Sequence, residues 1–271
     1  HNDVDVMFVV PKAYGDEDQS VARILNASDV LVDVRDRLYR EFWEHLSYIE
    51  VDSNLVPYVS DDEYYSIKNL SELTGTETKE QLYKRKYSFS GKYGKNLWDE
   101  VSRYALVASY IAEKQDFDVI HAHDWLTYQA GIEAKKVSGK PLVVHIHATE
   151  FDRSGENINQ RVFDLEQKGM LAADRVVAVS HFTRNIVINR YGIPADKVVT
   201  VHNGVSPLDK DLPHLQHPLR EKIVTFLGRI TFQKGPDYFV EAAHKVLMKD
   251  PNVRFVMAGS GDMMNRMIRR V

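Results

Sequence analysis

Residues 118–146, DVIHAHDWLTYQAGIEAKKVSGKPLVVHI, contain the pattern that decides the fold. Two short apolar runs, Asp118–Ala122 and Pro141–Ile146, have the length of buried strands and flank a helical stretch, Leu126–Val137. A strand, a helix and a second strand in this order are typical of a right-handed βαβ unit. The stretch therefore predicts an α/β domain with a parallel sheet.

The same alternation extends in both directions along the chain. Upstream, apolar residues from Leu97 to Ile111 recur at spacings of three and four, which predicts an amphipathic helix. Downstream, the expected elements are a helix at Gln160–Ala172, a strand at Arg175–Val179, a helix at His181–Tyr191 and a strand at Lys197–His202. These elements enlarge the parallel sheet.

The N-terminal third is less regular. Val4–Val10 is an apolar run closed by Pro11, and it predicts a buried strand. Helical spacing in Ser20–Leu38 is incomplete, and Tyr48–Val51 and Leu55–Val59 are candidate short strands. Aromatic residues are frequent between residues 39 and 93, where they fill an irregular core or form a sugar-stacking surface.

A break in the alternation indicates two domains. Residues 204–221 hold three prolines and mixed charges, a composition typical of a linker. The alternation then restarts with a strand at Ile223–Leu227, a helix at Pro236–Met248, a strand at Val253–Ala258 and a helix from Asp262 onward. We expect residues 1–204 to form a first domain, 205–221 a linker, and 222–271 the start of a second domain that is incomplete because two strands make too small a sheet.

Composition excludes several classes of site. The 271 residues include no cysteine, which excludes disulfides, thiolate metal sites and a cysteine nucleophile, and which fits a cytoplasmic protein. A formal net charge of -4 argues against broad binding to nucleic acid or to anionic membranes. No signal peptide and no transmembrane segment is expected.

Polar residues follow most of the expected strands, at the edge where open parallel sheets bind ligands. The clearest stretch runs from Gly228 to Gly235, between a strand and a helix that begins with Pro236. A helix N-terminus attracts anions, and Arg229 and Lys234 add two full charges beside it. The stretch predicts a diphosphate site, unless both side chains are ordinary solvated charges.

Two further patterns allow more than one interpretation. Gly259-Ser-Gly261 follows a strand and fits either a phosphate-facing turn or a plain tight turn, and it lacks the third glycine of a NAD fingerprint.

Histidines form the second pattern. His121 and His123 share one face of a strand, and His145 and His147 share a face of the next. They are candidate metal ligands, but we favour hydrogen bonding to loops or to a polyhydroxyl ligand. Asp124 is a candidate helix N-cap, and Trp125 is expected to pack where that helix begins.

The motifs HAHDW, HIHATEF, VSHFT, HNGV, LGRITFQKGPDYFVEAA and AGSGD, in this order, resemble retaining glycosyltransferases of family 4, the glycosyl transferases group 1 with glycogen and starch synthases. The resemblance covers Val119 to about Met264. It implies a GT-B fold, in which two Rossmann-like domains face each other across a cleft. It implies transfer of a hexosyl group from a UDP-, ADP- or GDP-sugar to a saccharide, with no cofactor and no metal.

Site roles follow from the matching positions. The resemblance gives Arg229, Lys234 and His147 catalytic roles, because the two cations hold the donor diphosphate and the histidine reaches the sugar. It places Gly228, Gly259 and Gly261 with Arg229 and Lys234 at the donor. It places Asp124 and Trp125 on the acceptor side. The same resemblance suggests an α-glucan as acceptor, and leaves open a cell-surface polysaccharide or a glycolipid.

The family pattern also contains parts that we do not find. We expect the chain to be truncated at both ends, without the first strand and its glycine-rich loop, and without a glutamate motif beyond Val271. A chain truncated in this way is expected to be inactive by itself. The alternatives are a metal-dependent hydrolase built on His121, His123, Asp124, His145 and His147, and a non-catalytic nucleotide- or sugar-binding fragment.

Overall fold

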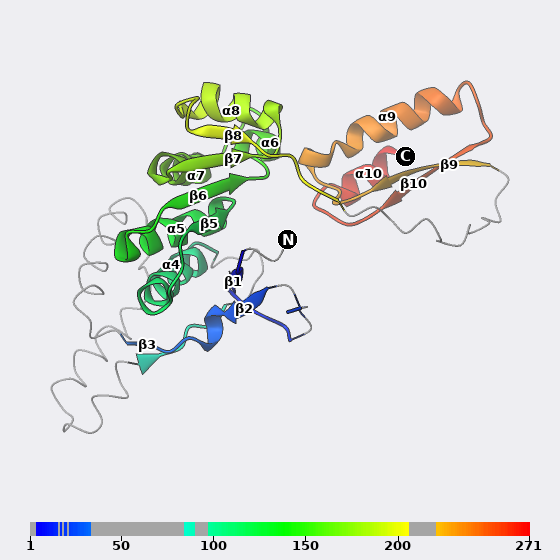
Figure 1. Cartoon of the computed structure of the whole chain (residues 1–271). Coiled ribbons are helices and arrows are strands. Elements are labelled where there is room, and N and C mark those ends of the chain that lie inside the picture. Colours follow the sequence, from blue (N-terminus) through cyan, green and yellow to red (C-terminus); the bar gives the residue numbers. More distant parts are fainter. Residues whose placement is uncertain are drawn as a thin grey trace. The chain divides into compact units, whose positions relative to one another are not determined.

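The fold was analysed in a computed structural model, which describes residues 4–15, 17, 19–20, 22–33, 84–89, 97–205 and 221–271 (Figure 1). The described residues fall into two compact units. Unit 1 holds the residues up to His147 together with Asp164–Val201, and unit 2 holds Ala148–Phe163 together with His202–Val271. Of the linker expected at 205–221, only Val205 and Glu221 belong to the described residues.

Unit 1 is built on a parallel sheet of four strands in the order β5-β6-β7-β8. The strands are β5 (Ile120–His123), β6 (Leu142–Ile146), β7 (Arg175–Ala178) and β8 (Val198–Thr200). Helices α5 (Trp125–Ser138), α7 (Gln160–Ala172) and α8 (His181–Tyr191) alternate with them along the chain (Figure 1). The predicted α/β class with parallel strands is therefore confirmed.

The core of this sheet follows from the apolar side chains of its strands. In β6, Leu142, Val144 and Ile146 are buried on one face, and the residues between them are only partly buried. Helix α5 lies so close to the sheet that a Cβ atom on Gly131 would be 2.8 Å from Leu142 Cδ1 and 3.0 Å from Ala122 Cβ. A small residue at this point lets the helix bury its apolar face against the strands.

A second, smaller sheet lies in the N-terminal part of unit 1. Strand β1 (Met7–Val10) pairs in parallel with β2 (Arg23–Asn26), and the Tyr104 hydroxyl of α4 (Leu97–Lys114) donates to the Val9 carbonyl at 2.7 Å. A short 3₁₀ turn (Ala27–Asp29) follows β2, and β3 (Val32–Asp33) pairs antiparallel with β4 (Lys84–Arg85).

Two expectations for this region were wrong. In its described part, Ser20–Leu38 contains no α-helix despite the incomplete helical spacing, because Arg23–Asn26 forms a strand beside β1. The first strand is not fully buried, because only one of its faces packs against the core. Met7 and Val9 lie on that face, while Phe8 on the other face is 50% exposed. The strands expected at Tyr48–Val51 and Leu55–Val59 lie outside the described residues.

Unit 2 contains the second alternation. Strands β9 (Lys222–Leu227) and β10 (Val253–Ala258) pair in parallel, and helices α9 (Pro236–Leu247) and α10 (Met264–Arg270) follow them. A 3₁₀ turn, η2 (Phe232–Lys234), precedes α9, and the short helix α6 (Glu150–Ser154) belongs to the same unit. Ile230, Met263 and Met267 form its buried core. Among the helices that the structure describes, none has an apolar stretch that could span a bilayer.

Candidate functional site

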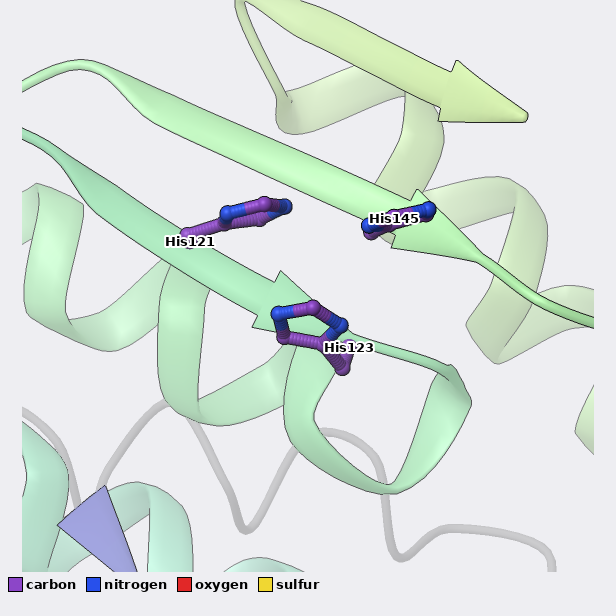
Figure 2. A group of neighbouring side chains, drawn as sticks. All are labelled: His121, His123 and His145. Atoms are coloured by element: carbon purple, nitrogen blue, oxygen red, sulfur yellow. The ribbon is translucent and has the colours of Figure 1, made fainter. Parts of the chain in front are cut away.

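Four histidines gather at the carboxyl ends of β5 and β6 in unit 1. Alternation along each strand sends His121 and His123 to one face, and sends His145 and His147 to the same face of the neighbouring strand. The strands pair so that His123 lies opposite His145. Figure 2 shows the rings of His121, His123 and His145 on one side of the two strands. The structure therefore brings the two predicted histidine pairs together.

The imidazole rings form a layer in which neighbours lie nearly face to face. Ring centroids are 4.4 Å apart for His121 and His123, 4.3 Å for His145 and His147, and 5.4 Å for His121 and His145. His123 Nδ1 lies 3.1 Å from His147 Nε2, a hydrogen bond in which the tautomers decide the donor. Both ring nitrogens of His145 are shielded from solvent and have no hydrogen-bond partner among the described residues.

Burial and mutual repulsion make these rings weak bases. Burial is the main cause that lowers the pKa of His145 to about 4, and the charges of His147, His123 and His121 add to it. Burial also lowers the pKa of His121 and of His123, although Asp124 opposes the shift at His123. The three rings are therefore neutral near pH 7, when each offers an unprotonated nitrogen.

Asp124 links the two strand ends. Its carboxylate oxygen Oδ1 accepts a hydrogen bond from the backbone N–H of His147 at 2.8 Å. Asp124 stands at the N-cap position of α5, but its side chain makes no capping bond, so that suggested role is corrected. Its backbone has φ 57° and ψ 168°, a conformation almost restricted to glycine. The carboxylate is thus directed at the residue after β6 instead of at the helix.

Trp125 supports this edge from inside the protein. Its side chain is 7% exposed, and its ring centroid lies 5.2 Å from that of Trp98 in α4. The expectation that it packs where the helix begins is confirmed. Little of its ring is accessible to an acceptor, so any influence on the acceptor side must act through the position of Asp124 next to it.

Residues 148–159 of unit 2 form an ordered turn that the sequence analysis did not single out. The Thr149 hydroxyl and the Asp152 carboxylate cap each other's backbone N–H groups at the start of α6. The buried Glu150 accepts from the Ser154 hydroxyl at 2.6 Å and from the Asn159 N–H at 2.9 Å, and Arg153 pairs with it. The Thr-x-x-Asp spacing was the signal for this cap.

The predicted diphosphate loop connects β9 to α9 in unit 2. Arg229 and Lys234 are both exposed, and Arg229 Nη2 donates to Gln233 Oε1 at 3.1 Å. Lys234 has no ion pair with any residue in the described part of the chain. Pro236 occupies the first turn of α9, as predicted. The carboxylate of Asp237 in that turn pairs with Arg266 and Arg270. The helix start therefore combines a free lysine with a neutralised carboxylate.

Two of the three predicted donor glycines, Gly259 and Gly261, have a structural reason for their small size. Beyond the two strands, the Gly228 N–H donates to the Ala258 carbonyl at 3.1 Å, and the Ile230 N–H donates to the Ser260 carbonyl at 2.8 Å. A Cβ atom on Gly259 would lie 1.9 Å from the Gly228 oxygen, and one on Gly261 would lie 2.2 Å from the Ile230 oxygen. The two loops pack backbone against backbone, so this close approach alone requires both glycines.

The predicted site residues thus occur in two sets, each described in its own unit. Unit 1 holds His147, Asp124 and Trp125 in one short region around the ends of β5 and β6. Unit 2 holds Gly228, Arg229 and Lys234 in the β9–α9 connection, next to Gly259 and Gly261.

Glycosyltransferases are among the known proteins to which this chain is similar. The chain is similar to an uncharacterised glycosyltransferase of Methanocaldococcus jannaschii, with 32% identity over 54% of this chain and 41% of the relative. It is also similar to the alpha-maltose-1-phosphate synthase of Mycolicibacterium smegmatis, with 34% identity over 53% of this chain and 41% of the relative. The chain therefore spans less than half the length of these two relatives.

A solved structure and two family models complete the comparison. The structure of Anabaena HepE in complex with UDP-glucose aligns with 80% of this chain and 62% of its own, at 17% identity and a TM-score of 0.49. The model described as Glycosyltransferase Family 4 matches residues 73–207, and the model described as Glycosyl transferases group 1 matches residues 209–271. The chain belongs to the group 1 glycosyltransferases of family 4.

Proposed function

We propose that this chain is part of a retaining hexosyltransferase, which moves a sugar from a nucleoside-diphosphate sugar to a saccharide acceptor. The observation that carries the proposal is the loop from Gly228 to Gly235. It places the cation of Lys234, which has no ion pair with the residues that the structure describes, two residues before the first residue of α9, with Arg229 in the same loop. A pair of cations beside a helix N-terminus suits the diphosphate of such a donor.

The chemistry of the departing group explains why these cations matter. As the bond between the sugar and the phosphate breaks, negative charge grows on the diphosphate oxygens. Arg229 and Lys234, whose charges are present before the reaction, stabilise that growing charge more in the transition state than in the bound donor. The donor glycines, Gly228, Gly259 and Gly261, add no side chains to this region. The base of the donor is uracil, adenine or guanine.

The residues of unit 1 are proposed for the sugar and the acceptor. His147 reaches the transferred sugar. Its backbone N–H donates a hydrogen bond to the Asp124 carboxylate at 2.8 Å, which holds the residue in position. Asp124 lines the acceptor side, and the buried Trp125 holds it in position. We assign no carboxylate nucleophile, and we propose that the transfer itself uses no cofactor and no metal.

The proposal also covers the identity of the acceptor. An α-glucan is our first choice, and it is supported by the similarity to an alpha-maltose-1-phosphate synthase. The family matches favour a transferase over the metal-dependent hydrolase. We also propose a cytoplasmic location, which the cysteine-free composition supports.

Isothermal titration of the intact protein, of which this chain is proposed to be part, with UDP, ADP and GDP, and with NAD as a negative control, tests the proposal. We expect saturable binding of one nucleoside diphosphate, and loss of at least about tenfold in affinity in Lys234→Ala, because a charge-assisted phosphate contact is removed. Lys245→Ala is the matched control, because Lys245 is an exposed lysine of α9 that pairs with Glu241. Equal binding by both variants, or no binding by the intact protein, would overturn the assignment.

A further inference from the structure

We propose that His121, His123 and His145 form a binding site for one divalent transition-metal ion of the Zn²⁺ type, and that the bound ion opposes sugar transfer. Transfer itself has no need of this ion. The proposed function assigns only His147 of the histidine layer and leaves the other three rings without a role. Imidazole is the side chain that ions of this type prefer, together with thiolate, which this chain lacks.

The backbone already places three ligands close together. One ligand nitrogen from each of the three rings lies within 4.8 Å of the others. In a tetrahedral site with Zn–N distances of about 2.0–2.1 Å, ligand nitrogens are roughly 3.3 Å apart. The difference is small enough for rotation of the side chains on fixed strands. Figure 2 shows that the rings extend from adjacent strands on one side of the sheet, so they can converge without a change of fold.

His145 gives a separate indication of a missing partner. Both of its ring nitrogens are shielded from solvent and unpartnered among the described residues. A polar atom left in this state destabilises the folded chain, and buried polar groups in proteins are nearly always satisfied. The imidazole rings of His121, His123 and His147 lie beside it. The nearby Asp124 carboxylate already accepts a hydrogen bond from the His147 N–H. An ion shared by the rings gives one of the two His145 ring nitrogens a partner without moving that carboxylate.

The fourth position of the ion follows from the same geometry. His147 Nε2 lies 3.1 Å from His123 Nδ1, close to the separation of two nitrogens on one tetrahedral ion. His147 can therefore complete the coordination in place of water. Since His147 is also the residue proposed to reach the sugar, metal binding and sugar transfer compete for it. This consequence rests on the proposed function, whereas the metal site does not.

Direct titration tests the site without any assay of transfer. Zn²⁺ is titrated into metal-free chain by calorimetry, and Co²⁺ is added separately to read the coordination from its visible absorption. We expect one equivalent of Zn²⁺ and a tetrahedral Co²⁺ spectrum. His145→Phe keeps a ring in the stack but removes both nitrogens, and it should weaken Zn²⁺ binding by at least about tenfold. His244→Ala, an exposed histidine of α9, should bind like the unchanged chain.

The outcomes separate this inference from the proposed function. Zn²⁺ binding that survives in His145→Phe, or its absence from the folded unchanged chain, overturns the metal site and leaves nucleotide binding unaffected. Zn²⁺ binding without any nucleoside diphosphate binding supports the metal site and contradicts the proposed donor site instead. If both are present, Zn²⁺ should inhibit transfer by the intact protein, and a chelator should restore it.

Discussion

The carboxylate of Asp124 accepts a hydrogen bond from the backbone N–H of His147, 23 residues further along the chain. The bond joins the loop after β5 to the residue after β6, at the edge of the sheet where the histidines gather. Asp124 makes it from a backbone conformation that glycine adopts far more easily, with φ 57°. Asp124 keeps a strained backbone while it makes this hydrogen bond to His147. The strain indicates that the position of His147 matters to the protein.

Substitutions at Asp124 separate the effect of the backbone strain on stability from the effect of the hydrogen bond to His147. Asp124→Gly relieves a backbone strain of about 1–3 kcal/mol but loses the acceptor, whereas Asp124→Ala keeps the strain and loses the acceptor. We therefore expect Asp124→Gly to be more stable than Asp124→Ala by about 1–3 kcal/mol in urea denaturation followed by circular dichroism. Asp124→Asn keeps an oxygen acceptor and should lie close to the unchanged chain. Equal stabilities of the glycine and alanine variants would contradict the strain.

Gly259 is predicted to be required by packing, whether or not a nucleotide binds. Gly228 and Gly259 have similar backbone angles, φ 153° and φ 149°, but a Cβ atom on Gly228 would meet nothing within 4 Å. A Cβ atom on Gly259 would lie 1.9 Å from the Gly228 oxygen. Gly259→Ala should therefore destabilise the chain by about 2 kcal/mol or more beyond Gly228→Ala, measured by the denaturant midpoint. Similar midpoints for the two variants would show that the loops do not pack as described.

The elements that the sequence predicts well are those whose periodicity is local. Val253–Ala258 has the same bounds in the prediction and in the structure, because a short β-branched and apolar run ends at a glycine turn. His181–Tyr191 also agrees, because Ser180 caps its start and Gly192 ends it. Arg23–Asn26 was missed, because four residues carry too little periodicity and the strand depends on pairing with β1.

The features of the candidate site also differ in how well the sequence predicts them. Alternation within one strand predicts that His121 and His123 share a face, and the βαβ connection makes β5 and β6 neighbours. The register that sets His123 opposite His145 depends on packing between the strands, so the contact of the two pairs could not be predicted. The clash between a Cβ atom at position 259 and the Gly228 backbone could not be predicted either, because it depends on how two loop backbones meet in space.

Removing the lysine charge should slow the chemical step. In the intact protein, we expect Lys234→Ala to reduce the rate of sugar transfer by about 100-fold or more, the usual effect of losing one preorganised group that stabilises developing charge. The measurement is single-turnover transfer at saturating donor, which separates this effect from weaker binding. Lys245→Ala removes an exposed lysine from the last turn of α9 and should leave the rate unchanged. Near-normal turnover in Lys234→Ala would remove the residue from the catalytic assignment.

The stability of the chain should depend on pH through His145. The folded chain keeps this ring neutral to about pH 4, because burial and the neighbouring histidines lower its pKa from 6.5. The unfolded chain binds the proton below about pH 6.5, so it holds more protons than the folded chain between these values. Stability must therefore fall as the pH drops from 6.5 to 4 and level off above 6.5. Urea denaturation at a series of pH values, with a chelator present, measures this slope. His145→Phe should make it shallower, whereas His244→Ala should not change it. A slope that is the same in all three chains would mean that His145 titrates normally in the folded protein.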